Sequence, residues 1–117
     1  MKSKEHTEIF ITPIDRETFS HVLLIGHKEM IKATKTMKVG DIVAIYIKTE
    51  KNFIPGIYGY GVVTSLAGSF AELTVTKFVK DRPIIELERL KKYTRSFGTT
   101  CRIKYDKVKM LHVLNMR

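Results

Sequence analysis

The sequence of 117 residues has no tryptophan, a single cysteine and three prolines. It also has no apolar run near the roughly 20 residues that cross a bilayer as a helix. A lone Cys101 excludes an internal disulfide and a cysteine-based metal site, and we expect no metal or other cofactor. The opening stretch, MKSKEHTE, lacks the apolar core of a signal peptide. We therefore expect a cytoplasmic protein that does not enter a membrane.

Acidic residues are also scarce, and the imbalance is uneven along the chain. The sequence has 21 Lys and Arg against 12 Asp and Glu, a formal net charge of +9. Residues 77–117 carry 12 Lys and Arg against 4 Asp and Glu, whereas residues 1–76 carry 9 against 8. A concentrated positive charge favours a polyanionic partner, nucleic acid above all. The alternative is a solvated basic surface that has no specific ligand.

Hydrophobic residues, in contrast, make up 44% of the chain and occur in short runs between turn signals. A chain of this length forms one domain, residues 1–117, with enough buried surface for a core. The runs predict an α+β fold, a small mixed or antiparallel β-barrel with one to three short helices. We expect strands near 8–12, 42–47, 57–65, 70–78 and 101–105, helices within 16–24 and after Pro83, a short helix or irregular connection over 27–38, and a strand or helix over 108–114.

The central stretch, residues 37–63, combines a Gly-Asp turn, a doubly apolar run and a second run rich in glycine and tyrosine. We expect 42–47 and 57–65 to be neighbouring antiparallel strands. Tyr58 and Tyr60 are two residues apart, which predicts that they share one strand face, with Gly59 and Gly61 on the other. Glycine within a strand marks a bulge, a bend or the close approach of another backbone or a ligand.

This stretch resembles the central hairpin of the PUA-like superfamily. The matching residues are Lys38-Val39-Gly40-Asp41, an apolar strand ending near Tyr46, and GIYGYGVV at 56–63. Within the superfamily the chain is most similar to EVE domains, which are relatives of the YTH and ASCH families, over roughly residues 8–78. The resemblance implies a pocket that holds one unpaired or flipped, often modified, base of DNA or RNA. Phe or Tyr would replace the tryptophan that such pockets usually contain, because this chain has none.

The candidate site residues follow from the resemblance and from the local sequence. The base pocket is expected to contain Thr12, Ile14, His21, Tyr46, Phe53 and Tyr58. Tyr58 is expected to stack on the base, and Phe53 is an aromatic in a polar loop, where ligand contacts are common. The phosphate-binding residues are expected to be Lys28, Lys91, Lys92 and Arg95. The last three lie in a segment that interleaves cations, aromatics and hydroxyls, as suits backbone and stacking contacts.

Two other functions remain open at this point. Gly26-His27-Lys28 matches the G-x-K element of ASCH proteins, some of which hydrolyse RNA-linked or nucleoside substrates. An enzyme of that kind would use Lys28 with Glu29 and Thr34 or Thr36, and we weigh it below nucleic-acid binding. The third possibility is a scaffold protein with a basic face. The resemblance also allows a place in a larger restriction or RNA-modification machine.

Overall fold

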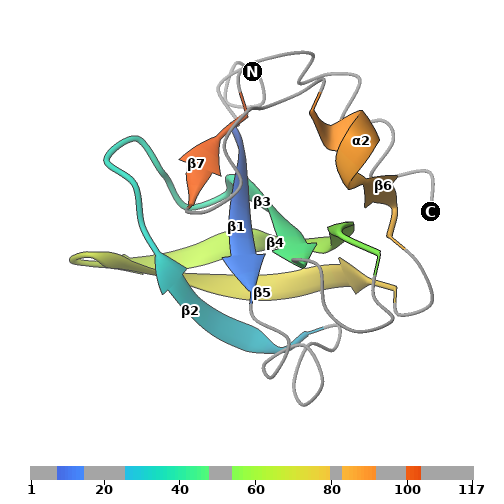
Figure 1. Ribbon diagram of the computed structural model, residues 1–117. Coiled ribbons are helices and arrows are strands. Elements are labelled where there is room, and N and C mark those ends of the chain that lie inside the picture. Colours follow the sequence, from blue (N-terminus) through green and yellow to red (C-terminus); the bar gives the residue numbers. More distant parts are fainter. Residues whose placement is uncertain (1–7, 15–25, 48–53, 80–82, 92–99, 104–117) are drawn as a thin grey trace, which may run out of the picture.

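The computed structural model describes residues 8–14, 26–47, 54–79, 83–91 and 100–103. The described elements are β1 (Ile9–Ile14), β2 (Lys28–Lys32), β3 (Ile42–Ile47), β4 (Gly56–Ala67), β5 (Phe70–Phe78), β6 (Ile85–Glu86), α2 (Leu87–Leu90) and β7 (Cys101–Arg102). This part of the chain is mostly β and contains one short helix (Figure 1).

The strands form one mixed sheet that curls into a half-barrel (Figure 1). The strand order is β2-β5-β4-β3-β1-β7, and β6 pairs with β4 off this path. β1 and β3 are parallel, with Ile9 opposite Ile42 and Ile14 opposite Ile47, whereas the other pairs are antiparallel. The expected mixed β architecture is therefore confirmed, as a curled sheet whose described edges are β2 and β7.

Three of the expected strands agree closely with the structure. β3 and β4 are antiparallel neighbours, as the Gly-Asp turn and the two apolar runs predict. β5 alternates as expected, with Ala71, Leu73 and Val75 buried. β1 continues through Pro13 to Ile14, beyond the end that the proline suggested.

The expectation for residues 27–38 was wrong at one point, because Lys28–Lys32 is strand β2 and not a helix or an irregular connection. This segment has only a weak strand pattern in its sequence, and it forms a strand because it pairs with β5. The segment after Pro83 begins as β6 and becomes helical only at Leu87–Leu90, with Leu90 fully buried. The helix expected within 16–24 and the element expected over 108–114 lie outside the described residues.

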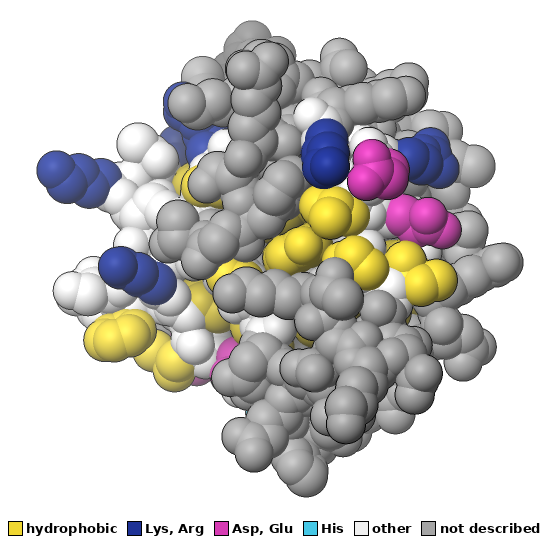
Figure 2. All heavy atoms as spheres, viewed as in Figure 1, with side chains coloured by type: hydrophobic (Ala, Val, Ile, Leu, Met, Phe, Trp, Pro, Cys, Tyr) yellow, Lys and Arg dark blue, Asp and Glu magenta, His cyan; other side chains and the backbone are white. Residues whose placement is uncertain are grey.

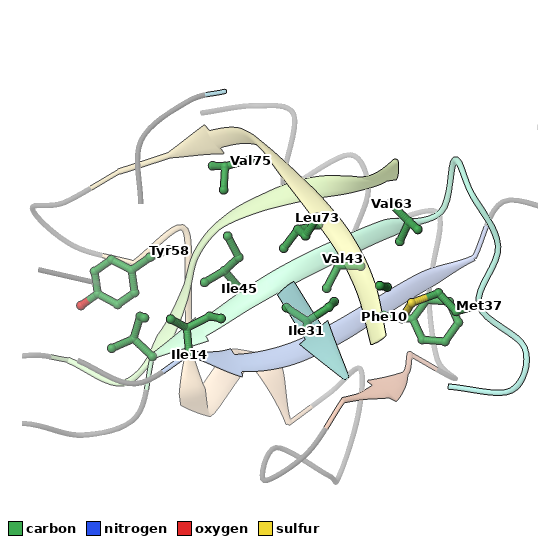
Figure 3. Packing of buried hydrophobic residues seen from close by; sticks show 12 residues of the cluster. Phe10, Ile14, Ile31, Met37, Val43, Ile45, Tyr58, Val63, Leu73 and Val75 are labelled. Atoms are coloured by element: carbon green, nitrogen blue, oxygen red, sulfur yellow. The ribbon is translucent and has the colours of Figure 1, made fainter. Parts of the chain in front are cut away.

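Two hydrophobic clusters occupy opposite faces of β3, whose residues alternate between them. The first cluster lies within the curve of the sheet (Figure 3) and contains Phe10, Ile14, Ile31, Met37, Val43, Ile45, Ile47, Tyr58, Val63, Ala71, Leu73 and Val75. The second cluster contains Ile9, Ile11, Ala44, Tyr46, Ile57, Ile84, Ile85, Leu90 and Ile103. β6, α2 and the residue after β7 cover this second face. A strand apolar on both sides is thus buried on both sides, as its sequence predicts.

A β-bulge at Tyr58 changes the faces expected for the two tyrosines. Ile45 pairs with Gly59 and Tyr46 pairs with Ile57, so Tyr58 is the extra residue on β4. Tyr58 consequently joins the first cluster, whereas Tyr60 packs against the second. The prediction that the two rings share a face was wrong, because the bulge interrupts the two-residue period between them.

The glycines of β4 permit close approach by β5. A Cβ at Gly61 would lie 2.5 Å from the backbone oxygen of Thr74 and 2.7 Å from Cδ1 of Leu73. A Cβ at Gly59 would overlap the carbonyl oxygen of Lys77. Two of the explanations that the sequence left open for these glycines are therefore seen here, the approach of another backbone and an irregular register beside Gly59 and Gly61.

The buried side chain of Asp41 ties the start of β1 to the turn that precedes β3. Its Oδ1 accepts a hydrogen bond from the backbone N–H of Glu8 at 3.1 Å, and its Oδ2 accepts one from the N–H of Lys38 at 2.8 Å. Gly40 has φ of 99°, a conformation that favours glycine, and its N–H donates to the carbonyl of Val63 on β4. The Gly-Asp turn thus joins β1, β3 and β4.

We predict that Asp41→Asn lowers the free energy of unfolding by about 2 kcal/mol and Asp41→Ala by about 3 kcal/mol. The asparagine amide would place a donor against one of the two backbone N–H groups, and alanine would leave both without an acceptor. Urea unfolding followed by circular dichroism measures the change. Glu88→Gln is the charge-matched control, because its side chain is 82% exposed and should change stability by less than about 0.5 kcal/mol. Equal stability of Asp41→Asn and Glu88→Gln would contradict this role.

Candidate nucleic-acid interface

Two of the expected pocket residues, Ile14 and Tyr58, lie at the same end of the first cluster (Figure 3). Ile14 ends β1 and is the register partner of Ile47, which ends β3. Tyr58 is 1% exposed, and its hydroxyl donates a 2.7 Å hydrogen bond to the carbonyl of Ile54. This end of the first cluster is therefore apolar and includes the ring of Tyr58. That ring is covered in this structure, so its stacking on a base stays a prediction.

The other described pocket candidates are Tyr46 and Thr12, and their contacts are with other residues. Tyr46 belongs to the second cluster, on the opposite face of β3 from Ile45 and Ile47. Thr12 is 3% exposed, and its hydroxyl lies 2.8 Å from that of Thr100, beside β7. The structure therefore brings Ile14 and Tyr58 together but separates them from Tyr46. His21 and Phe53 lie outside the described residues.

Burial changes the acidity of the two described tyrosines of this set. Removal from water raises the pKa of Tyr46 above 10.0. The pKa of Tyr58 is also raised above 10.0, mainly by burial, with a further upward contribution from Glu86 and an opposing one from the hydrogen bond to Ile54. Both rings are therefore neutral phenols at physiological pH.

The phosphate candidates lie on different elements. Lys28 is exposed at the start of β2, with its Nζ 3.9 Å from the Glu72 carboxylate. Lys91 follows α2, with its Nζ 3.4 Å from Glu88. Both ion pairs are exposed to solvent and contribute little stability. Figure 1 shows β2 and α2 in separate parts of the fold, and Lys92 and Arg95 lie outside the described residues.

Sequence reasoning missed an exposed sheet surface formed by β2 and β5. We call it the β2–β5 face, and its residues are Lys28, Met30 and Lys32 on β2 with Phe70, Glu72 and Thr74 on β5. Met30 is 55% exposed and Phe70 is 54% exposed. Figure 2 shows exposed hydrophobic side chains near Lys and Arg side chains at the left of the view, where Figure 1 has the turn between β4 and β5. An aromatic on the polar face of an alternating strand was the signal available in the sequence.

The lysine proposed for hydrolysis is solvated. The Lys28 side chain is 63% exposed, whereas a catalytic lysine is typically desolvated or close to another cation. Glu29 lies next to it in sequence but bonds to His27, with 3.1 Å between Oε1 and Nε2. Among the described residues, no three His, Cys, Asp or Glu side chains form a metal-binding group. No helix in the same residues is long and apolar enough to cross a membrane.

Comparisons with protein-family models, with curated proteins and with solved structures gave no match to this chain.

The raised tyrosine pKa values predict a loss of stability in alkali. The folded state favours the neutral phenols, so the two tyrosines contribute to the free energy of unfolding. That contribution is present below pH 10.0 and is lost as the pH rises through the raised pKa values. We expect the double variant Tyr46→Phe/Tyr58→Phe to lose less stability than the wild type between about pH 9 and about pH 11. Urea unfolding across this range measures the difference. Parallel stability curves for the two proteins would show that neither phenol is shifted.

Tyr58 also offers a test of its packing at neutral pH. Tyr58→Phe keeps the ring and removes the hydroxyl that donates to Ile54, which should cost about 1 kcal/mol of unfolding free energy. Tyr58→Ala empties a buried aromatic site and should cost about 3–5 kcal/mol. Thermal or urea unfolding of the two variants checks the ranking. A Tyr58→Ala variant as stable as Tyr58→Phe would mean that the ring is not part of the core.

Proposed function

We propose that this chain is a nucleic-acid-binding module of the PUA-like type that recognises one unpaired or flipped base and binds the adjoining phosphates with a basic surface. The Gly-Asp turn, its pairing with the glycine-rich β4 and the curled mixed sheet support the type of fold. The net charge of +9 supports a polyanionic ligand.

The observation that carries the proposal is a series of exposed lysines from β2 to the Gly-Asp turn. Its members are Lys28, Lys32, Lys35 and Lys38, all of them exposed. The acidic residues of the same segment are already engaged, since Glu29 bonds to His27 and the buried Asp41 accepts two backbone hydrogen bonds. Of the four lysines, Lys28 has an ion pair among the described residues, at 3.9 Å from Glu72. The exposed lysines are suited to phosphate contacts, which supply most of the affinity of sequence-independent binding.

The end of the half-barrel at Ile14 and Tyr58 is the base site in this proposal. It has an apolar floor, and Ile54 at its border is 48% exposed. Phe53 precedes Ile54 in the sequence and lies outside the described residues, and it stays a candidate for stacking. The proposal assigns Tyr58 to the floor beneath the base, because its ring is buried and its hydroxyl is bonded to Ile54.

Hydrolysis is not proposed as a second function, because the solvated Lys28 does not meet the chemical requirement for it. A scaffold role with an acidic protein partner predicts electrostatic binding of oligonucleotides without preference for single strand over duplex. Competition between single-stranded and duplex oligonucleotides therefore distinguishes that role from the proposed function.

We predict that the protein binds a labelled single-stranded oligonucleotide with an affinity that falls steeply with salt. The variant Lys32→Ala/Lys35→Ala/Lys38→Ala should reduce the salt slope by about 2, since each phosphate contact to a single strand contributes about 0.7. Lys91→Ala/Lys92→Ala/Arg95→Ala, in the basic C-terminal third, should flatten the slope similarly. Fluorescence anisotropy at a series of salt concentrations measures both effects.

The control keeps the charge and changes only the side-chain shape. Lys32→Arg/Lys35→Arg/Lys38→Arg should retain the wild-type slope, because the slope counts charges that displace counterions. No binding of single-stranded or duplex oligonucleotide at low salt would refute the proposed function. A wild-type slope in either alanine variant would exclude that set of residues from the phosphate surface.

A further inference from the structure

The β2–β5 face presents an aromatic ring whose exposure the packing of the fold does not explain. Phe70 is the first residue of β5 and is 54% exposed, whereas the next residue, Ala71, is fully buried in the first cluster. Phe70 therefore lies on the side of β5 that faces away from the core. An exposed phenylalanine leaves a large apolar surface in water, which is typical of a contact site.

The register places cations beside this ring. Phe70 pairs directly with Lys32 on β2, and Glu72 pairs with Met30. Side chains opposite each other on one face of a sheet are about 5 Å apart, and diagonal neighbours about 7–8 Å apart. Lys32 is thus the cross-strand neighbour of Phe70, and Met30 is a diagonal neighbour on the same face. Lys28 lies four residues from Lys32 on the same strand face, about 13 Å away along β2.

The carboxylate on this face is occupied by other side chains. An oxygen of Glu72 accepts a 2.7 Å hydrogen bond from the hydroxyl of Thr64 and lies 3.9 Å from Nζ of Lys28. Among the described residues, Lys32 has no ion pair. Among the described residues, the β2–β5 face therefore carries two lysines against one carboxylate, and the lysine beside Phe70 is the one without an ion pair.

The backbone holds the ring and the lysine in this arrangement. The N–H of Ala33, which follows Lys32, donates a 2.9 Å hydrogen bond to the carbonyl of Ser69, which precedes Phe70. Gly68 takes φ of 61° in the turn before it. The pairing of β2 with β5 thus extends beyond Lys32 and Phe70, and the relative position of the two side chains is fixed by main-chain bonds.

We propose that the β2–β5 face is a second contact site for single-stranded nucleic acid, in which Phe70 stacks on an unpaired base and Lys32 and Lys28 bind phosphates of the same strand. This inference rests on the proposed function, but it uses a surface apart from the base site at Ile14 and Tyr58. A benzyl ring stacks on any base, so the contact is tolerant of sequence and adds affinity to a neighbouring selective site. A strand that follows β2 reaches both lysines.

The composition of this face favours a nucleic acid over a protein as its occupant. The cores of protein interfaces are depleted of lysine, and a stable interface buries roughly 800 Å² on each partner. On the β2–β5 face the exposed apolar side chains are Met30 and Phe70, and they lie among lysines and hydroxyls. One ring among cations matches the pattern of stacking and phosphate contacts that proteins use for single strands.

The test compares four variants of the full chain for binding of labelled single-stranded oligo-dT and of its duplex with oligo-dA. Phe70→Ala should weaken single-strand binding about tenfold, within the range that stacking on one base contributes. Its salt slope should stay at the wild-type value, because no cation is removed. Phe70→Tyr keeps an aromatic face and should bind as the wild type does. Phe70→Leu keeps an apolar side chain without the ring and should bind as weakly as Phe70→Ala.

Leu66→Ala is the matched control. Leu66 is 42% exposed on the same hairpin, but it pairs with the buried Ala71 and not with a residue of the β2–β5 face. We expect wild-type affinity for this variant and folded circular dichroism spectra for all four. Affinity lost equally in Leu66→Ala and Phe70→Ala, or kept in Phe70→Leu, would overturn stacking at Phe70.

The remaining outcomes separate this inference from the function on which it rests. If the wild type binds neither oligonucleotide, both proposals fail. If the wild type binds and Phe70→Ala binds equally well, the second contact site fails while the proposed function stands. If Phe70→Ala weakens single strand and duplex to the same extent, the ring does not read unpaired bases and the inference is overturned.

Discussion

The buried carboxylate of Asp41 is the interaction on which the arrangement of the sheet depends. It accepts hydrogen bonds from the backbone of Glu8 and of Lys38, at the point where β1 meets the turn into β3. The backbone carbonyl of the same residue accepts from the N–H of Val63 on β4. One residue therefore links β1, the Gly-Asp turn and β4. Burial of a carboxylate costs free energy, and these bonds to its charged form offset that cost.

This link matters because hydrophobicity alone does not set the register of β3. The alternate residues of β3 enter two different cores, so a shift by one residue would replace apolar side chains with apolar side chains on both faces. Shape resists such a shift, since Val43 and Ile45 lie opposite Gly61 and Gly59, where β5 approaches closely. Asp41 fixes one end of the strand and the bulge at Tyr58 marks the other.

The sequence predicted those strands whose position depends on nearby residues, such as flanking turns and runs of apolar side chains. β3, β4 and β5 were predicted because turn residues flank each of them and each has an apolar or alternating pattern of strand length. β2 was missed, because Lys28–Lys32 has little pattern of its own and becomes a strand by pairing with β5. The face of β4 on which Tyr58 lies depends on a β-bulge, and the alternation of residues in the sequence does not predict that bulge. Closely packed glycines were foreseen as a feature but not with β5 as the cause.

The residues of the candidate site could likewise be predicted only in part from the sequence. The exposure of Lys28 could be foreseen from its charge, and Ile14 and Tyr58 lie at the same end of the first cluster. Tyr46 is separated from them because it lies between Ile45 and Ile47 on β3 and therefore faces the second cluster, and both faces of this strand are buried. The exposure of Phe70 was not foreseen, because an aromatic at the start of a strand is usually counted toward the core. The alternation of β5 places it on the opposite face from Ala71, and the pairing of β5 with β2 shows that lysines share its face.

The topology also has a consequence for the order of assembly. β3, β4 and β5 follow one another in the chain and close short loops, whereas β1 must pair in parallel with a strand 33 residues away. Loop-closure entropy therefore opposes the docking of β1 more than the formation of the β3–β5 meander. Before β1 docks, the carboxylate of Asp41 lacks the Glu8 N–H and stays hydrated. We therefore expect the Asp41 carboxylate to lose its hydration in the step that adds β1. Desolvation of this group and closure of the long loop would then occur in the same folding step.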